Sequence, residues 1–109
     1  MNKQRVKIMS NKIYTIQGET YTLEMSKYIS NGNTSAILRS TDDLSVYRKI
    51  STNIREKLPT NQVAIKTWAE NESWINEFLV QTDWIFTNQI THSGFVQIPI
   101  YEIPSTKTN

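Results

Sequence analysis

The spacing of the apolar residues changes once along this chain, within residues 63–80. Before this segment, apolar and polar residues alternate in twos, as in β-strands with one buried face. Within it, they recur at intervals of three and four, so that Ile75, Phe78 and Leu79 share one helical face with Trp74 beside them. This single change of period predicts an α+β fold, in which an antiparallel meander carries one main α-helix on one face, in two layers.

The predicted helix runs from about residue 72 to residue 81. Asn71 suits the N-cap position, and Glu72 lies in the first turn, where the helix dipole favours an acid. Thr82 and Asp83 are expected to end the helix. Its apolar face would then cover the sheet.

Strands are predicted on both sides of this helix, joined by turns at residues 31–33, 42–43 and 93–94. They cover residues 13–17, 20–29, 34–41, 44–54, 63–67 and 95–103, and residues 84–86 are expected to form a late strand or an extended connection packed under the helix. Ile29 and Val46 are assigned to buried faces. Pro99 predicts that the last strand lies at a sheet edge, since proline cannot donate to a central ladder. Arg48 falls among the apolar positions, where it is expected to reach solvent at an edge or to pair with an acid such as Glu24.

The chain is long enough for one domain and one core. With 109 residues and 38% hydrophobic content, two domains would leave neither with enough area to bury. We expect a single domain over residues 13–103, a flexible basic N-terminus over residues 1–12 and a flexible tail over residues 104–109.

Composition excludes several classes of protein. The chain has no cysteine, which rules out a disulfide framework, a cysteine-ligated zinc site and a thiol nucleophile. No apolar run is long enough to span a bilayer, and the polar opening lacks the apolar centre of a signal peptide. These features predict a cytoplasmic protein without membrane contact.

The chemistry of catalysis is sparse in this sequence. His92 is the only histidine and lies at a predicted turn, and the three glycines are too scattered for a phosphate-binding loop. Glu70, Glu72 and Glu77 form the nearest approach to a carboxylate cluster, but roles at a helix start explain them. We therefore predict no enzyme, no cofactor and no metal, with a carboxylate- or metal-dependent activity as the minor alternative.

Two sets of residues are candidates for binding. The first surrounds the predicted helix and suits a protein partner, because tryptophans are strong interface anchors. It comprises Trp68, Glu70, Glu72, Trp74 and Trp84. The second is cationic and aromatic and suits a nucleic acid, although a net charge of +2 is small for a dedicated binder. It comprises Lys3, Arg5, Lys7, Lys12, Tyr47, Lys49 and Arg55.

Three segments resemble a family of small bacterial proteins that carry a domain of unknown function. The segments are the hairpin at residues 28–37, the stretch at residues 63–72, which contains Lys66-Thr67-Trp68-Ala69-Glu70-Asn71-Glu72, and the ending at residues 93–103, which contains Gly94-Phe95 and Pro99-Ile100. They match the family patterns K-x-[WY]-x-E-N-E and G-F-x-x-x-P-[VI]. The chain departs from the family at Ser73, where a glycine is usual. The resemblance implies a protein of plasmids, conjugative elements or phages, without an established enzymatic activity.

Two functions follow as hypotheses. The first is a non-enzymatic protein-interaction module of a mobile genetic element, acting as an inhibitor of a host defence system of the CRISPR or restriction type. Its partner would be a host or element-encoded protein, such as a nuclease or defence effector. The second is a nucleic-acid-binding accessory or regulatory protein of a phage or plasmid. Homodimerisation through an exposed sheet edge is compatible with either.

Overall fold

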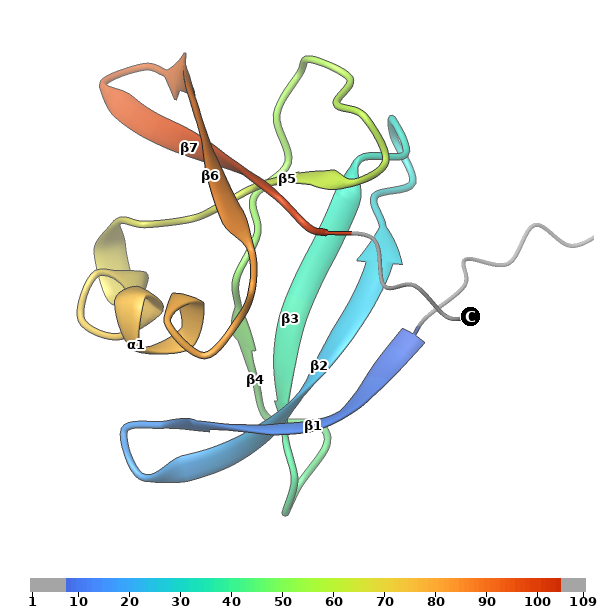
Figure 1. The fold of residues 1–109 in the computed structure, drawn as a ribbon, viewed down its shortest axis with the longest axis vertical. Helices are drawn as coiled ribbons and strands as arrows, with labels where there is room; N and C mark the ends of the chain where they lie inside the picture. The colour runs from blue at the N-terminus through green and yellow to red at the C-terminus, as the bar shows by residue number, and fades with distance from the viewer. Residues whose placement is uncertain (1–7, 105–109) are drawn as a thin grey trace, which may run out of the picture.

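The computed structural model describes residues 8–104, with side chains from Ser10 onward, and about half of these residues lie in β-strands. Figure 1 shows the described elements in chain order. They are β1 (Ile8–Ile16), β2 (Glu19–Lys27), β3 (Thr34–Ser40), β4 (Tyr47–Lys49), β5 (Gln62–Ala64), the 3-10 turn η1 (Ala69–Asn71), α1 (Ile75–Leu79), β6 (Ile85–Ser93) and β7 (Val96–Glu102). The predicted flexible segment 1–12 thus includes the start of β1. Residues 1–7 and 105–109 of the predicted termini lie outside the described part.

The strands form two antiparallel sheets that enclose the core. The first sheet has the order β1-β2-β3-β4, and the second has the order β5-β7-β6. A bridge between Ser51 and Ile65 joins the sheets, and the Thr52 N–H donates to the Ala64 carbonyl at 3.0 Å beside it. In Figure 1, β5 lies beside the upper end of β3, the β6–β7 hairpin rises at the upper left, and α1 lies at the left.

The predicted α+β fold with one main helix over a sheet is wrong. Helix α1 spans only five residues, Ile75–Leu79, and the second sheet takes the place that the helix was expected to fill. The predicted cap also fails, because the Asn71 side chain bonds elsewhere and no side chain caps α1. The apolar face was predicted correctly: Ile75 and Phe78 are buried and Leu79 packs against the core.

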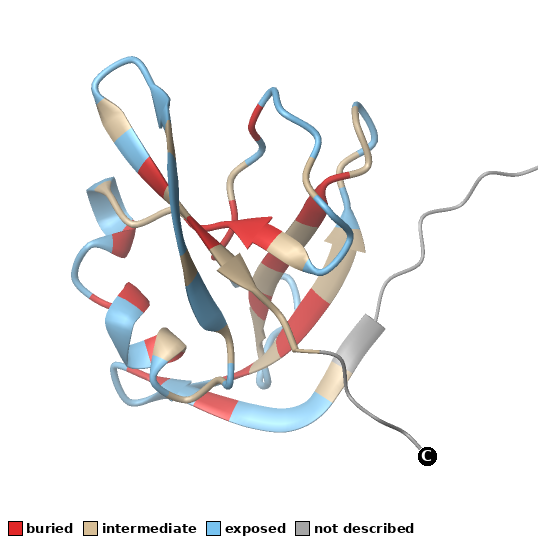
Figure 2. Cartoon of the chain, turned by 45° about the horizontal axis from the view of Figure 1, so that its top comes forward, coloured by how far each residue is buried: buried red, intermediate tan, exposed pale blue. Residues whose placement is uncertain are grey.

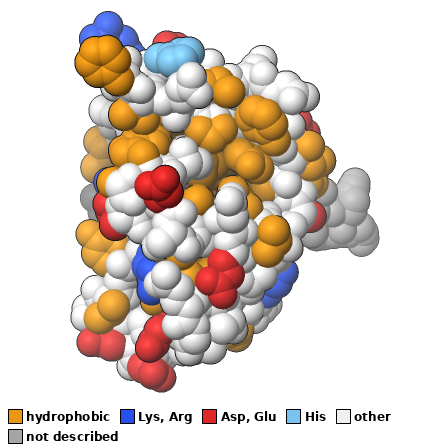
Figure 3. All heavy atoms as spheres, turned by 90° about the vertical axis from the view of Figure 1, so that its left-hand side faces the viewer, with side chains coloured by type: hydrophobic (Ala, Val, Ile, Leu, Met, Phe, Trp, Pro, Cys, Tyr) orange, Lys and Arg blue, Asp and Glu red, His pale blue; other side chains and the backbone are white. Residues whose placement is uncertain are grey.

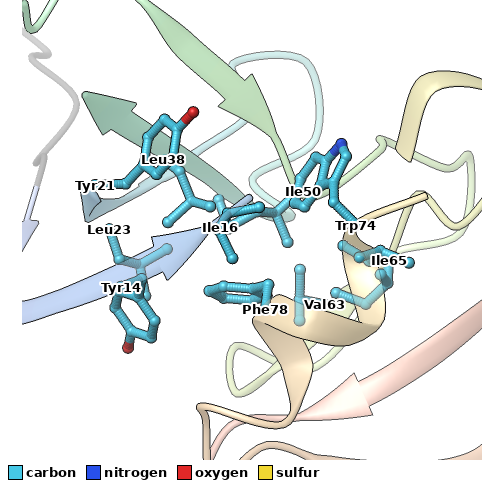
Figure 4. Packing of buried hydrophobic residues seen from close by; sticks show 12 residues of the cluster. Tyr14, Ile16, Tyr21, Leu23, Leu38, Ile50, Val63, Ile65, Trp74 and Phe78 are labelled. Atoms are coloured by element: carbon cyan, nitrogen blue, oxygen red, sulfur yellow. The ribbon is translucent and has the colours of Figure 1, made fainter. Parts of the chain in front are cut away.

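The main core lies between the first sheet, β5 and α1 (Figure 4). Phe78 projects from α1 into its centre, with ring centroids 5.2 Å from Tyr14 and 5.3 Å from Trp84. Ile16 and Val63 are fully buried beside it. A second cluster, formed by Ile54, Ala64, Ile98 and Ile100, lies apart from it around β5 and β7.

The strand predictions hold where alternation is regular, fail near turns, and miss most of β6, of which only the first two residues fall within the predicted segment 84–86. Tyr21 and Leu23 are buried, but Ile29 is 82% exposed and Val46 52% exposed. Val46 lies in a turn that Asp43 organises, since its carboxylate accepts hydrogen bonds from Ser45. The expected strand over residues 44–54 is therefore reduced to β4 and the bridge that follows it.

Pro99 does not mark an edge, because β7 is the central strand of the second sheet. The carbonyl of Pro99 accepts a hydrogen bond from the Ile65 N–H at 3.1 Å, one residue after β5 ends at Ala64. In a β-strand, the N–H and the carbonyl of one residue point to the same side, so the N–H that proline lacks would have faced β5. The pairing between β5 and β7 already ends at this point. A central proline is tolerated here because its neighbour is short.

The buried hydroxyl of Tyr14 makes stability depend on pH in the alkaline range. Burial, together with the charge of Asp83, raises the pKa of Tyr14 above its usual 10.0. The unfolded chain then loses this proton first, so the contribution of Tyr14 to stability is present below pH 10.0 and is lost as the pH rises through the folded-state pKa. Between about pH 8 and pH 11, we expect the free energy of unfolding, measured with urea, to fall less in Tyr14→Phe than in the wild type. Equal losses in the two proteins would contradict this.

No helix among residues 8–104 is long and apolar enough to cross a membrane.

Candidate functional site

A hollow lies where β4 meets the segment that leads into α1. The two segments are held side by side, since the Lys66 N–H donates to the Ile50 carbonyl at 2.9 Å just after β4. The hollow is lined by residues from both segments, namely Tyr47, Arg48, Lys49, Glu70, Asn71 and Trp74. We call it the β4 hollow.

Asn71 fixes the geometry of the β4 hollow. Its side chain is almost fully buried, at 1% exposure, and its Nδ2 donates to the carbonyls of Lys49 at 2.7 Å and Lys66 at 2.9 Å. One amide thus ties β4 to the approach to η1. The Oδ1 of Asn71 is buried without a hydrogen-bond partner among the described residues, which is a local cost that the fold tolerates here.

Arg48 is held between two aromatic rings at the inner side of the hollow. Its guanidinium carbon lies 5.3 Å from the centre of the Tyr21 ring and 5.2 Å from that of Trp74. Its Nε donates to the Tyr21 hydroxyl at 2.7 Å and its Nη2 to Gln17 Oε1 at 3.1 Å. Both acceptors are uncharged, so these bonds orient the cation without neutralising it.

The rim of the hollow carries charges of both signs. Lys66 Nζ lies 2.7 Å from Glu70 Oε2, and the hydrogen bond from Lys66 holds the pKa of Glu70 below its usual range, with Lys49 adding a smaller effect. Glu70 therefore stays ionised at neutral pH. Lys49 is exposed, and Tyr47 is 53% exposed, which leaves both available to a ligand.

A second hollow adjoins the first across β4. It lies on the outer face of the first sheet and is lined by Glu24, Ser26, Tyr28, Ser35, Ile37, Arg39, Tyr47 and Lys49. Arg39 Nε lies 2.7 Å from Glu24 Oε1, and its guanidinium lies 5.5 Å from the centre of the Tyr47 ring. Tyr47 and Lys49 line both hollows and form the ridge between them.

The structure brings together residues from both predicted sets. Glu70 and Trp74, expected to contact a protein, line the same hollow as Tyr47 and Lys49, expected to contact a nucleic acid. However, Trp74 is only 3% exposed and serves as a wall rather than as an anchor.

The other predicted residues lie elsewhere. Trp68 packs on the second cluster, Trp84 packs edge-on against Phe78, and Glu72 is exposed outside the hollow. Arg55 lies in a different hollow with His92. Lys12 bonds the Gln81 carbonyl from β1. Lys3, Arg5 and Lys7 fall outside the described residues.

Sequence reasoning missed the roles of Arg48 and Asn71. Glu24, the acid suggested as a partner for Arg48, pairs with Arg39 instead, because both project from the outer face of the first sheet. Arg48 projects to the inner face, as its place among the apolar positions indicated, but its partners there are uncharged. The local sequence does not show whether the Asn71 side chain caps a helix or bonds a distant segment of the chain.

The residues considered for catalysis are not assembled into a centre. His92 is exposed on β6, next to Arg55 and Glu56, whereas Glu70 and Glu72 lie around η1. Within residues 8–104, no group of three or more His, Asp or Glu side chains is arranged to hold a metal ion.

No family model matches the chain, and no curated protein or solved structure matches it with significance. The family resemblance drawn from the residue pattern therefore stays a prediction.

Proposed function

We propose that this protein is a non-enzymatic protein-binding module of the cytoplasm, and that the β4 hollow is its contact surface. The observation that carries the proposal is that the exposed Tyr47 and Lys49 lie beside Arg48, which uncharged acceptors orient and which has no ion pair among the described residues. Asn71 fixes the floor of the hollow beneath them. Tyrosine and arginine are enriched among the residues that dominate binding energies. A preformed floor lowers the entropic cost of association.

The mixed charge of the hollow favours a protein over a nucleic acid. Glu70 is ionised at the rim and already paired with Lys66, so a protein partner can place a donor near Glu70 and a carboxylate near Lys49, whereas a phosphate could use only the second contact. The cations Lys66 and Arg39 are already paired with Glu70 and Glu24. Among the described residues that line the two hollows, Arg48 and Lys49 are then the cations left for the extended phosphate contacts that nucleic-acid binding needs.

The class of partner comes from the sequence resemblance. Small proteins of mobile elements often inhibit host defence, and a protein-binding surface suits an inhibitor that covers a nuclease or defence effector. We extend the proposal to that class. Its partner surface should be acidic, to match Arg48 and Lys49.

Changing the ridge of β4 should abolish capture of the partner. We expect immobilised wild-type protein to retain one stoichiometric partner from host lysate, and the double variant Tyr47→Ala with Lys49→Glu to bind that purified partner at least about tenfold more weakly by calorimetry. Lys57→Glu makes the same charge change at an exposed site outside the hollow and should bind like the wild type. Capture of no partner, or equal affinity of the double variant, would overturn the proposal.

Nucleic-acid binding is the second candidate, favoured by the exposed Tyr47 ring beside Lys49. A ring in this position can stack on a base while the lysine contacts a phosphate. Fluorescence anisotropy with labelled single-stranded DNA separates the two functions. Binding that falls steeply with salt in the wild type, and that Tyr47→Ala removes, would favour this candidate instead.

A further inference from the structure

We infer that two copies of this chain pair along the outer edge of β6. The segment that contains β6 is free of formal charge. Residues 84–101, which include β6 and most of β7, contain no Asp, Glu, Lys or Arg, and this is the longest such run in the chain. It does not depend on the function proposed for the β4 hollow.

This uncharged hairpin is also unusually exposed. Every residue of β6 is exposed except Thr87 and Thr91, which are half-buried (Figure 2). Ile85 is 56% exposed, Ile90 47% and Phe95, at the turn, fully exposed. Figure 3 shows hydrophobic side chains gathered over the upper half of one face of the molecule, with the only histidine, His92, at its top. Uncharged, apolar and exposed surface is typical of homodimer interfaces.

The edge of β6 is open, whereas the opposite edge of the fold is covered. On β1, the Gln81 side chain accepts from the Thr15 N–H at 3.1 Å and donates to the Thr15 carbonyl at 2.9 Å, and Glu77 accepts from the Gln17 N–H at 3.1 Å. Strand β6 is the outermost strand of its sheet, and among the described residues only β7 pairs with it. Natural proteins usually protect such edges with charge or proline, and β6 has neither.

The ladder of β6 indicates where pairing occurs. A bulge between Phe86 and Gln89, with Asn88 at φ 70°, bends the strand, and regular pairing resumes from Gln89 to Ser93. Because β5 pairs only with residues 100–102, this outer stretch is a two-stranded ribbon. Such ribbons are marginal alone and gain from a further strand.

A second copy is the occupant that fits this edge. Antiparallel pairing of identical strands is a two-fold contact, in which each strand offers the same groups to the other. With no charged side chain on either strand, self-pairing brings no like charges together. A partner that is attracted by charge would have no complementary charge to bind on β6. The product is a continuous four-stranded ribbon, with Ile90 near the centre of the new contact.

Analytical ultracentrifugation tests the inference, with a matched pair of variants. We expect the wild type to be a dimer at high concentration, Ile90→Lys to dimerise at least about tenfold more weakly, and Ile29→Lys, at a site 82% exposed between β2 and β3, to behave like the wild type.

Amide hydrogen exchange of the wild type gives a second readout that needs no variant. Protection at Gln89–Ser93 should rise with protein concentration. A wild type that is monomeric at millimolar concentration, an Ile90→Lys variant as dimeric as the wild type, or exchange independent of concentration would each overturn the inference.

Discussion

Replacing Phe78 by Ala is expected to lower the free energy of unfolding by about 3–5 kcal/mol, the cost of removing a large aromatic side chain from a closed core. Phe78 is fully buried, and its ring packs against those of Tyr14 and Trp84. Its removal would leave a cavity among these side chains. A domain of this size has a stability of about 5–15 kcal/mol, so the variant should be close to unfolding.

Phe95 provides the matched control, since its side chain is fully exposed at the turn between β6 and β7. Urea unfolding, followed by tryptophan fluorescence, should place Phe95→Ala within about 0.5 kcal/mol of the wild type. Similar losses in the two variants would mean that Phe78 does not occupy the centre of the core.

The second large effect is expected from Asn71→Ala. This change leaves the carbonyls of Lys49 and Lys66 without their donor, at about 1–3 kcal/mol for each buried group left unpaired. It also removes the unpartnered Oδ1 of Asn71, which offsets part of that cost. We expect a net loss of roughly 2–4 kcal/mol in the free energy of unfolding.

Asn76→Ala is the control for this prediction, because Asn76 is exposed on α1. Urea unfolding of both variants should show a loss confined to Asn71→Ala. An Asn71→Ala protein as stable as the wild type would mean that the amide does not tie β4 to η1, and the rigidity assigned to the β4 hollow would be wrong.

Local signals in the sequence were sufficient for β2, β3 and the turn between them. Alternation placed Tyr21 and Leu23 in the core, and the turn at Gly32 needs the positive φ of 79° that glycine adopts readily. The same kind of signal identified the buried face of α1 through Ile75 and Phe78. These elements are decided by residues close together in the chain.

The position of β5 and the docking of the second sheet on the first could not be predicted in the same way, because contacts between distant residues determine both. The bridge between Ser51 and Ile65, and the pairing of β5 with β7, join segments without a shared local pattern. Ten residues with helical spacing favoured a longer helix than α1. The chain instead makes the turn η1 first, with Ala69 at φ 58°, because Asn71 is drawn towards β4.

The candidate site was predicted in pieces. Tyr47 and Lys49 were identified by their exposed alternation, and Glu70 and Trp74 by their place at the helix start, but as members of two rival surfaces. They meet only because Ile65 pairs with Ser51, which brings the segment before α1 next to β4. The Asn71 side chain then bonds the Lys49 carbonyl and holds the two segments together. The type of each side chain indicated that it could bind a ligand. Which residues would lie next to it in the site depended on the tertiary structure.

Hydrogen exchange of this protein, with and without the captured partner, tests the central claim most directly. The account predicts that the partner protects the backbone amides of Tyr47–Lys49 and of residues 66–74, which surround the β4 hollow, and leaves those of Gln89–Ser93 on β6 unchanged. Protection confined to the β6–β7 hairpin, with no change around β4, would contradict it.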